Sequence, residues 1–432
     1  MTGVAANVAL RRGACPGLSV PMPSGDGLLA RLRPIGTISL AAFAGLCAAA
    51  RQFGNGVVEV TSRGSIQIRG LTASSAARFA DAVAALAISA DDGIPVHSNV
   101  LTGLDAHEIL DAGSVAGQLR RALAATSLPA RLSPKISVVI DGGGALGLHN
   151  LAADVRLSAD SANGDTVFHI GVAGDAATAT KLGIVTHTDG VEAAQRILDV
   201  IARHGRAARA RDVLATDGAA PFKVALANIG VAAAHSASNT KTRAAEPIGM
   251  HLLRDGSFAC GLGLAFGHAD ATTLESLAQT ANVSGASGIR VAADRALLII
   301  GLTERTTAII AAEAERLGFI VRADDPRRYV IACAGAPICA SGHIAARGIA
   351  RAVTEAAGKY LDSNFRVHIS GCVKGCAHAG AANLTIVGRA DGCAVIANGS
   401  VHDAPVLPAT TDKLPSVIAE LVRAAKGNAG HV

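Results

Sequence analysis

The chain overlays itself when its sequence is shifted by 231 positions, and this internal repeat limits its possible folds more than any other feature. Under the shift Gly25 falls on Gly256, and Ser39 falls on Asp270. Ser and Asp are preferred residues at a helix N-cap, and in both copies apolar residues follow at the spacing of one buried helix face. We therefore expect two copies of one structural unit.

Strand-like runs flank the repeated helix in each copy. The runs 28–33 and 259–264 precede the caps, and the runs 57–69 and 289–300 follow the helices. These patterns predict a strand–helix–strand half-unit that occurs twice, with the two halves paired in an α+β fold.

Four of the eight cysteines form two pairs, Cys333-x5-Cys339 and Cys372-x3-Cys376, with 32 residues between the pairs. Four clustered thiols suit a 4Fe–4S cluster, because each iron takes one thiolate ligand. Structural zinc fits less well, since zinc sites usually place about two to four residues between paired cysteines. Two disulfides would need an oxidising compartment, which no feature of the sequence indicates.

The two copies differ in the residues that carry chemistry. The four cysteine positions are occupied in the first copy by Thr102, Glu108, Asp141 and Ala145. Three arginines of the first copy have no basic counterpart, since Arg31, Arg33 and Arg63 fall on Leu262, Leu264 and Asp294. Arginine presents a planar fork that suits carboxylates, so we expect one half to supply metal ligands and the other to bind an anion. The alternative is that these arginines are surface residues of a strand.

Composition and charge exclude several classes of function. Aromatic residues make up only 3% of the chain, too few to stack on bases, so nucleic-acid binding is not expected despite a net charge of +5. The uncharged run 34–50 is 17 residues long and too interrupted to span a membrane. No apolar stretch follows Arg11-Arg12, so no export signal is expected. These features predict a cytoplasmic monomer with reduced thiols.

Two histidines are candidate catalytic residues. His378 lies two residues after Cys376, and His97 precedes the polar pair Ser98-Asn99. Lone histidines are more often ordinary loop residues, so this alternative stays open for both. Cys15, in a Gly/Pro-containing loop, is the one further thiol with a context for reactivity.

The cysteine tetrad behind a twofold-repeated chain resembles the sulfite and nitrite reductase superfamily, whose members bind a 4Fe–4S cluster against a tetrapyrrole. The segments 31–34, 61–65, 98–100 and 132–135 resemble its active-site segments. The resemblance covers nearly the whole chain and implies that Arg31, Arg33, Arg63 and Lys135 contact the tetrapyrrole. It also implies ferredoxin-like half-repeats at 1–75 and 245–305, a reductase-like domain without a cluster at 90–232, and a cluster domain of the nitrite/sulfite reductase 4Fe–4S type at 324–432.

Three departures from the reductase pattern bear on function. Ser98 and Ser137 stand where reductases of the superfamily carry an arginine and a second lysine, and Lys374 stands where they usually carry an asparagine. Reducing a small anion such as sulfite requires several cations around it. The sequence has lost two of them, while the features for a cluster and a tetrapyrrole remain.

One branch of the superfamily, the precorrin-3B synthases, is similar in the segments 12–16, 25–29, 141–144, 332–337 and 370–378. This resemblance implies oxygen-dependent hydroxylation and lactone formation on precorrin-3A in aerobic cobalamin synthesis, with dioxygen and an NAD(P)H-linked electron donor. It implies Cys376 as the ligand nearest the tetrapyrrole, and siroheme or a mononuclear non-haem iron as second cofactor. Two alternatives are a siroheme-dependent sulfite or nitrite reductase and a non-catalytic iron–sulfur electron-transfer subunit.

Replacing Cys372 by serine should cripple the cluster, since serine does not supply a thiolate. We expect the Cys372→Ser protein to lose iron, sulfide and visible absorption, as measured by elemental analysis and spectroscopy. Thr102→Ala, at the position matching Cys333, should leave the iron content unchanged. Full iron and sulfide with an unaltered spectrum in Cys372→Ser would contradict the ligand assignment.

Overall fold

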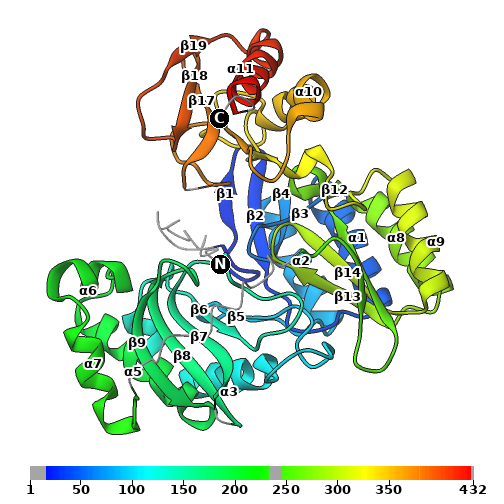
Figure 1. The fold of residues 1–432 in the computed structure, drawn as a ribbon. Coiled ribbons are helices and arrows are strands. Elements are labelled where there is room, and N and C mark those ends of the chain that lie inside the picture. The colour runs from blue at the N-terminus through cyan, green and yellow to red at the C-terminus, as the bar shows by residue number, and fades with distance from the viewer. Residues whose placement is uncertain (1–15, 163, 233–245, 379, 430–432) are drawn as a thin grey trace, which may run out of the picture.

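The computed structural model describes residues 16–162, 164–232, 246–378 and 380–429 (Figure 1). Cys15 and the residues between the predicted units 90–232 and 245–305 lie outside this described part. The described strands form four sheets, one with four strands and three with five, and helices pack against them. The mixed α+β class predicted from the sequence is confirmed.

The N-terminal sheet carries the first copy of the repeated unit, and all its neighbouring strands are antiparallel. In spatial order its strands are β1 (Met22–Ser24), β2 (Gly27–Leu32), β4 (Ile66–Leu71), β3 (Val57–Val60) and β12 (His268–Asp270). Two helices belong to it, α1 (Leu40–Phe53) and α2 (Ala73–Ala85). Helix α1 begins where the sequence predicts, because the Ser39 side chain accepts a hydrogen bond from the Ala42 amide at 3.2 Å.

The β10–β14 sheet carries the second copy, again with antiparallel neighbours. In spatial order its strands are β10 (Gly249–Leu252), β11 (Phe258–Gly263), β14 (Ala296–Leu302) and β13 (Gly288–Ala292). Its helices are α8 (Ala271–Val283) and α9 (Glu304–Arg316). Strand β12, which precedes α8 in the chain, pairs with β3 instead, so the second copy completes the sheet of the first.

One hydrophobic core serves both copies. Helix α1 packs on α8, and Figure 1 shows α1, α8 and α9 on the same side of the molecule. Leu46 and its repeat counterpart Leu277 are both fully buried in this core. The two halves are therefore joined by shared apolar burial as well as by a shared sheet.

Each predicted second strand is a hairpin, so the prediction of continuous strands at 57–69 and 289–300 is wrong. In the first copy the chain turns between β3 and β4, where Gly64 has φ +73° and the Thr61 amide donates to the Ser65 carbonyl at 2.9 Å. In the second copy Asp294 and Arg295 adopt φ +61° and +62° between β13 and β14. Apolar residues continue on both sides of each turn, so periodicity did not mark it.

The remaining two sheets have the same plan as each other: the first three strands are parallel and the last two antiparallel. The β5–β9 sheet contains β5 (Val96–Ser98), β6 (Val138–Asp141), β7 (Ala153–Ala162), β8 (Asp165–Gly174) and β9 (Thr180–Thr186). The C-terminal sheet contains β15 (Val330–Ala332), β16 (Val367–Ser370), β17 (Ala382–Arg389), β18 (Gly392–Gly399) and β19 (Leu407–Ala409). This agreement is consistent with the predicted duplication.

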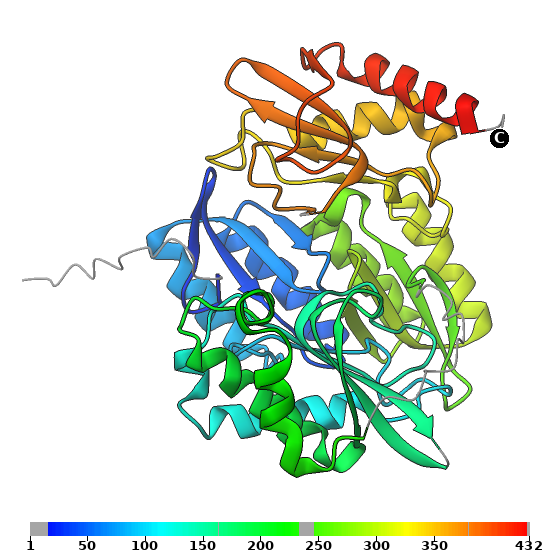
Figure 2. The same ribbon diagram turned by 60° about the vertical axis from the view of Figure 1, so that its left-hand side comes forward.

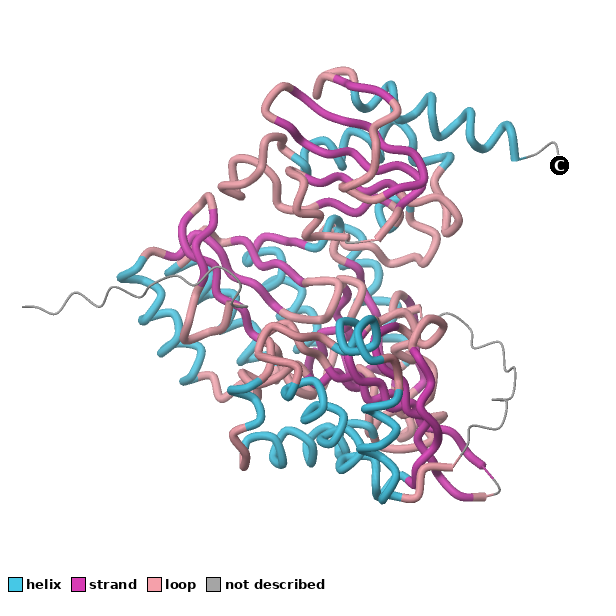
Figure 3. The backbone as a smooth tube through the Cα atoms, turned by 90° about the vertical axis from the view of Figure 1, so that its left-hand side faces the viewer, coloured by secondary structure: helices cyan, strands magenta, loops and turns pink. Residues whose placement is uncertain are grey.

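Helices cover both of these sheets. The β5–β9 sheet has α3 (Ala112–Ala124), α4 (Leu128–Arg131), α5 (Gly190–Arg203), α6 (Ala210–Asp217) and α7 (Ala220–Leu226). The C-terminal sheet has α10 (Ala346–Ala357) and α11 (Leu414–Ala429). Figures 2 and 3 show the C-terminal sheet above the N-terminal sheet, with the dark blue β1–β2 hairpin of Figure 2 reaching up to it. Within the described ranges no helix combines the length and apolar character needed to cross a membrane.

Candidate active site

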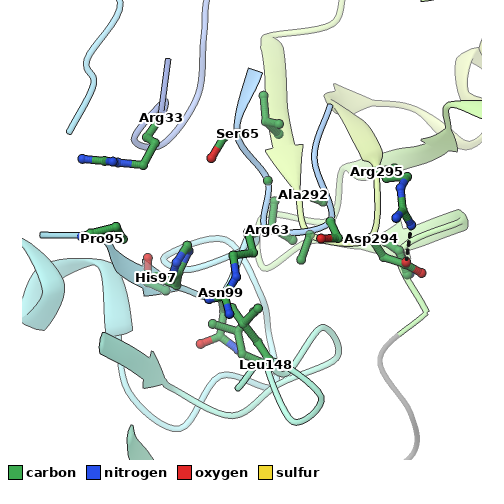
Figure 4. A pocket seen from close by; sticks show the side chains of 18 of the residues that line it. Arg33, Arg63, Ser65, Pro95, His97, Asn99, Leu148, Ala292, Asp294 and Arg295 are labelled. Atoms are coloured by element: carbon green, nitrogen blue, oxygen red, sulfur yellow. Dashed lines mark ion pairs between the residues drawn. The ribbon is translucent and has the colours of Figure 1, made fainter. Parts of the chain in front are cut away.

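A cavity of about 580 Å³ lies where all four sheets meet. The N-terminal sheet contributes the residues around Arg33 and Arg63, and the β5–β9 sheet contributes the segment from Val96 to Val100. The β13–β14 hairpin and the C-terminal sheet also contribute to the wall, with residues that include Arg295 and Cys376. Figure 4 shows Arg33 and His97 on one side, Asp294 and Arg295 on the other, and Arg63 between them.

The turn that carries Arg63 is fixed by local hydrogen bonds and by the opposite hairpin. The Thr61 hydroxyl accepts from the Ser65 amide at 3.0 Å, and the Asp294 amide donates to the Ser62 carbonyl at 3.0 Å. A Cβ on Gly64 would lie 3.1 Å from the backbone of Ala292, so the two hairpin turns pack closely. Arg63 and its repeat counterpart Asp294 therefore border the same cavity.

The cations of the cavity are all arginines: Arg33, Arg63, Arg120, Arg290, Arg295 and Arg366. Some of them are committed to the fold. Arg290 donates to the carbonyls of Val100 and Thr102 at 2.8 Å, and Arg120 pairs with Asp91 at 3.3 Å.

Arg33 keeps donor capacity for a ligand. Its Nη2 donates to the Gly93 carbonyl at 2.6 Å, whereas its Nε is buried with no hydrogen-bond partner in the described part of the chain. A buried donor without a partner is costly, so a bound acceptor at this point would stabilise the site. The cavity is thus suited to a ligand with several carboxylates.

Two of the residues implied by the resemblance lie elsewhere. Arg31 does not line the cavity and lies within β2, whereas Arg33, just past the end of that strand, does line it. With the Gln67 amide oriented to satisfy both neighbours, its oxygen accepts from Arg31 Nε at 3.0 Å. Lys135 is exposed and also does not line the cavity.

His97 is half-buried, with its ring on the cavity wall (Figure 4). Burial lowers its pKa to about 3, and the charges of Arg63, Arg33 and Arg120 add to this effect. The imidazole is therefore neutral at physiological pH, when it has one donor and one acceptor nitrogen. It offers the cavity a neutral hydrogen-bonding group among cations.

The second candidate, His378, also lines the cavity. Its Nε2 lies 3.1 Å from the Ala381 carbonyl, and its ring meets the buried His368 ring edge-on at 5.6 Å. His149, Arg120 and Arg366 also border the cavity and were missed by sequence reasoning. They stand in no motif, so only the three-dimensional arrangement could find them.

The four cysteines come from two loops that follow parallel neighbours. Strand β15 ends just before Cys333, and its neighbour β16 ends shortly before Cys372. Parallel neighbours end at the same edge of a sheet, so their loops meet there. The Gly371 amide donates to Cys333 Sγ at 3.0 Å, and the Lys374 ammonium donates to the Ser341 hydroxyl at 2.7 Å.

The four thiols lie close enough to affect one another. Burial raises the pKa of Cys376, and the charges of Cys333, Cys372 and Cys339 raise it further. In the described part of the chain no group of three or more His, Cys, Asp or Glu residues is arranged to hold a single metal ion. A cubane cluster gives each thiolate its own iron, so its ligands do not converge on one ion. The donor set and spacing thus fit a cluster better than zinc.

Only one of these four thiols borders the cavity. Cys376 lines it, whereas Cys333, Cys339 and Cys372 do not. A cluster held by the four cysteines would therefore touch the cavity at Cys376. All seven described cysteines are free thiols.

In the first copy a polar network involves positions that match the four cysteines. The Thr102 hydroxyl donates to Glu108 at 2.6 Å, joining the two positions that match Cys333 and Cys339. The Asn99 amide donates to Asp141 at 2.8 Å and accepts from the Gly142 amide at 2.7 Å. Asn99 is thus committed to shaping the glycine-containing turn, as is the Asp105 carboxylate, which accepts from the Ala145 amide at 2.6 Å.

Comparison with known proteins agrees with this arrangement. Residues 20–86 match the nitrite/sulfite reductase ferredoxin-like half domain. The solved structure of the Mycobacterium tuberculosis NirA protein has a similar fold, with a TM-score of 0.77, 19% identity, and coverage of 92% of this chain and 80% of that one. A precorrin-3B synthase from a Sinorhizobium species is 36% identical over 430 residues, which is 99% of this chain and 92% of that protein.

The chain therefore has a fold similar to that of NirA, and its residues 20–86 match a half domain of nitrite and sulfite reductases. The near-complete match at 36% identity is with a synthase rather than a reductase. The chain belongs to the precorrin-3B synthase family and is an enzyme.

The lowered pKa of His97 predicts a pH-dependent stability. Between about pH 6.5, the ordinary histidine pKa, and about pH 3, the unfolded chain binds a proton at this residue and the folded protein does not. The free energy of unfolding should therefore fall as pH falls through this window, by at most about 1.36 kcal/mol per pH unit.

Denaturant titrations at several pH values within this window measure the effect. His97→Gln should flatten the pH dependence, whereas His402→Gln, at an exposed histidine outside the cavity, should retain the wild-type slope. Equal slopes for His97→Gln and wild type would show that His97 is protonated in the folded protein.

Proposed function

We propose that this chain catalyses the oxygen-dependent hydroxylation of precorrin-3A and the accompanying lactone formation. The observation that carries the proposal is the position of Cys376, a predicted cluster ligand, in the wall of an arginine-lined cavity. Such a cavity suits a tetrapyrrole with carboxylate side chains next to a source of electrons. One atom of dioxygen enters the substrate and the other leaves as water, so the reaction consumes electrons and protons.

The carboxylates of the substrate would bind to Arg33, Arg63 and Arg366. Guanidinium groups bind carboxylates through paired hydrogen bonds, which fix the orientation of the macrocycle as well as its affinity. Burial and the positive charges of Arg63 and Arg33 keep the imidazole of His97 neutral. At one ring nitrogen it can accept a hydrogen bond from a substrate group, and because it stays neutral it adds no further cation to the cavity.

The four cysteines Cys333, Cys339, Cys372 and Cys376 would hold a 4Fe–4S cluster. When bound, the cluster supplies single electrons. The chain's own residues keep it in place through the two loops and present the Cys376 side to the substrate. Thiolate ligands need a reducing compartment, which supports a location in the cytoplasm.

We further propose that the tetrapyrrole bound in this cavity is the substrate, precorrin-3A, and that no siroheme binds beside it. A volume of about 580 Å³ lies within the range of about 300–1,000 Å³ that holds one small ligand. The described residues also offer no group of ligands for a mononuclear iron, so no step is assigned to one.

Sulfite or nitrite reduction is less well supported. Ser98 lines the cavity in place of an arginine, Lys135 is exposed outside the wall, and Ser137 is buried away from it. The cluster of cations that a small anion needs is therefore incomplete. An electron-transfer subunit, the other alternative, would have no need for a cavity lined by arginines. The NAD(P)H-linked donor and the monomeric state remain predictions.

Removal of the Arg63 guanidinium should weaken precorrin-3A binding more than it affects folding. A hydrogen bond to a charged group is worth about 1.5–3 kcal/mol, so Arg63→Ala should raise the dissociation constant roughly ten- to a hundredfold. Equilibrium binding under anaerobic conditions measures this change.

The repeat counterpart Asp294 is not a suitable control, because it borders the same cavity and pairs with Arg328 at 3.4 Å. Arg131→Ala is the matched control, since Arg131 pairs with Asp199 on the surface and lies outside the cavity. Equal losses of affinity in the two variants would show that Arg63 does not bind the substrate.

Turnover with isotope-labelled dioxygen tests the function itself. With precorrin-3A and a reductant, mass spectrometry should find a hydroxylated lactone that carries one labelled oxygen atom. The rate of sulfite and nitrite reduction should be several powers of ten lower than that of a reductase, because each missing cation is worth about 3 kcal/mol to the transition state. Rapid siroheme-dependent sulfite reduction without labelled product would restore the reductase alternative.

A further inference from the structure

A buried ionic network lies between the N-terminal sheet and the cysteine loop 333–339. At its centre is Arg69 on β4, which is 5% exposed. Its Nη2 lies 3.3 Å from Asp26 and its Nε lies 3.7 Å from Glu59. Glu59 in turn accepts from Arg347 of α10 at 2.6 Å. None of these four charges lines the cavity, so substrate binding does not account for them.

The network reaches the peptide group that precedes a cluster ligand. The Ile338 carbonyl accepts from Arg69 Nη2 at 2.9 Å and from the Gly25 amide at 3.1 Å. The nitrogen of the same peptide group belongs to Cys339, and it donates to the Gly335 carbonyl at 2.7 Å. Both ends of the peptide that joins Ile338 to Cys339 are therefore fixed.

The β1–β2 turn is shaped to press against this loop. A Cβ on Gly25 would lie 2.5 Å from the Ala340 nitrogen and 2.7 Å from the Cys339 carbonyl carbon, so only glycine allows the approach. Asp26 is held by the Ser24 hydroxyl at 2.7 Å and by the Asn55 amide at 2.9 Å. The partner that orients Arg69 is thus itself oriented.

Strand β4 connects this network to the cavity. The strand begins immediately after Ser65, which lines the cavity, and carries Arg69 near its other end. A strand holds its residues at fixed spacing. The cavity wall and the support of the Cys339 loop are therefore parts of one rigid element.

The network contains equal numbers of positive and negative charges. Removing any one of them should therefore change the reduction potential of the cluster in a predictable direction. Two guanidinium groups face two carboxylates in a buried environment, where charges are screened less than in water. A reduced cluster carries one more negative charge than an oxidised one. Loss of a nearby cation therefore disfavours reduction, and loss of a nearby anion favours it.

We propose that Arg69, oriented by Asp26, is a positioning residue for the iron–sulfur cluster, holding the Cys339 loop and setting the reduction potential of the cluster. The proposal rests on the cluster assignment above. Arg69 acts by holding the Ile338–Cys339 peptide group and by its positive charge, and it does not line the substrate cavity.

The test compares the reduction midpoint potential of the cluster in anaerobically purified full-length variants, measured by redox titration with spectroscopic detection. Arg69→Gln should make the potential more negative by a shift equivalent to about tenfold in the reduction equilibrium, about 59 mV for a one-electron couple. Asp26→Asn should shift it by a similar amount in the opposite direction, because Arg69 then loses a compensating anion.

Arg69→Lys, which keeps the charge, should stay near the wild-type potential. Arg51→Gln is the matched control, since it breaks the ion pair between Arg51 and Glu275 at 2.9 Å on α1, away from the loop. Shifts of the same sign in Arg69→Gln and Asp26→Asn, no shift in either, or an equal shift in Arg51→Gln would overturn the proposal.

Iron and sulfide analysis separates this proposal from the function it rests on. Wild-type protein without iron and sulfide would remove the cluster assignment itself. If Arg69→Gln fails to assemble the cluster, Asp26→Asn decides alone, because its sidechain keeps nearly the same shape and its expected shift has a fixed sign. A positive shift there supports the electrostatic role, and a negative or absent shift contradicts it.

Discussion

Two parallel strand pairs set the position of the four cysteines and of the polar network that faces them across the cavity. Because β15 and β16 run in the same direction, the loops after them meet at one sheet edge and bring Cys333 next to Cys372. The same relation between β5 and β6 brings Asn99 next to the turn after Asp141. Both edges face the cavity, so the cluster ligands and the opposite wall depend on strand direction rather than on local sequence.

The two edges are cross-linked by different chemistry. At one, two loops bring together the four thiols that we propose as cluster ligands. At the other, Asn99, Asp141 and the pair Thr102 and Glu108 join the loops by hydrogen bonds. A duplicated plan therefore tolerates the absence of metal ligands in one copy, provided that buried polar groups there find partners. This network holds the turn after Asp141. The chain continues from that turn into the segment of the cavity wall that contains His149.

The arginines of the cavity are arranged to favour a large ligand with several carboxylates over a small anion such as sulfite. Arginines from several elements border the space, and burial together with the charges of Arg63, Arg33 and Arg120 keeps His97 neutral. Several of these guanidinium groups are fixed by carbonyls, such as Arg63 by that of Ala152 at 3.0 Å. Fixed donors spread around a wide cavity suit carboxylates at the rim of a macrocycle, whereas sulfite would need them gathered around one point.

The sequence by itself determined the α+β class, the cap at Ser39 and the four cysteines, because N-cap chemistry and thiol spacing are local properties. It also singled out Arg33, Arg63 and His97, all of which border the cavity. Only the tertiary structure decided that Arg31 and Lys135 lie outside it and that Arg120, His149 and Arg366 border it. It also replaced two expected strands by hairpins. Which side chains meet depends on where each strand ends and on which strands run parallel, and neither is written in residue spacing.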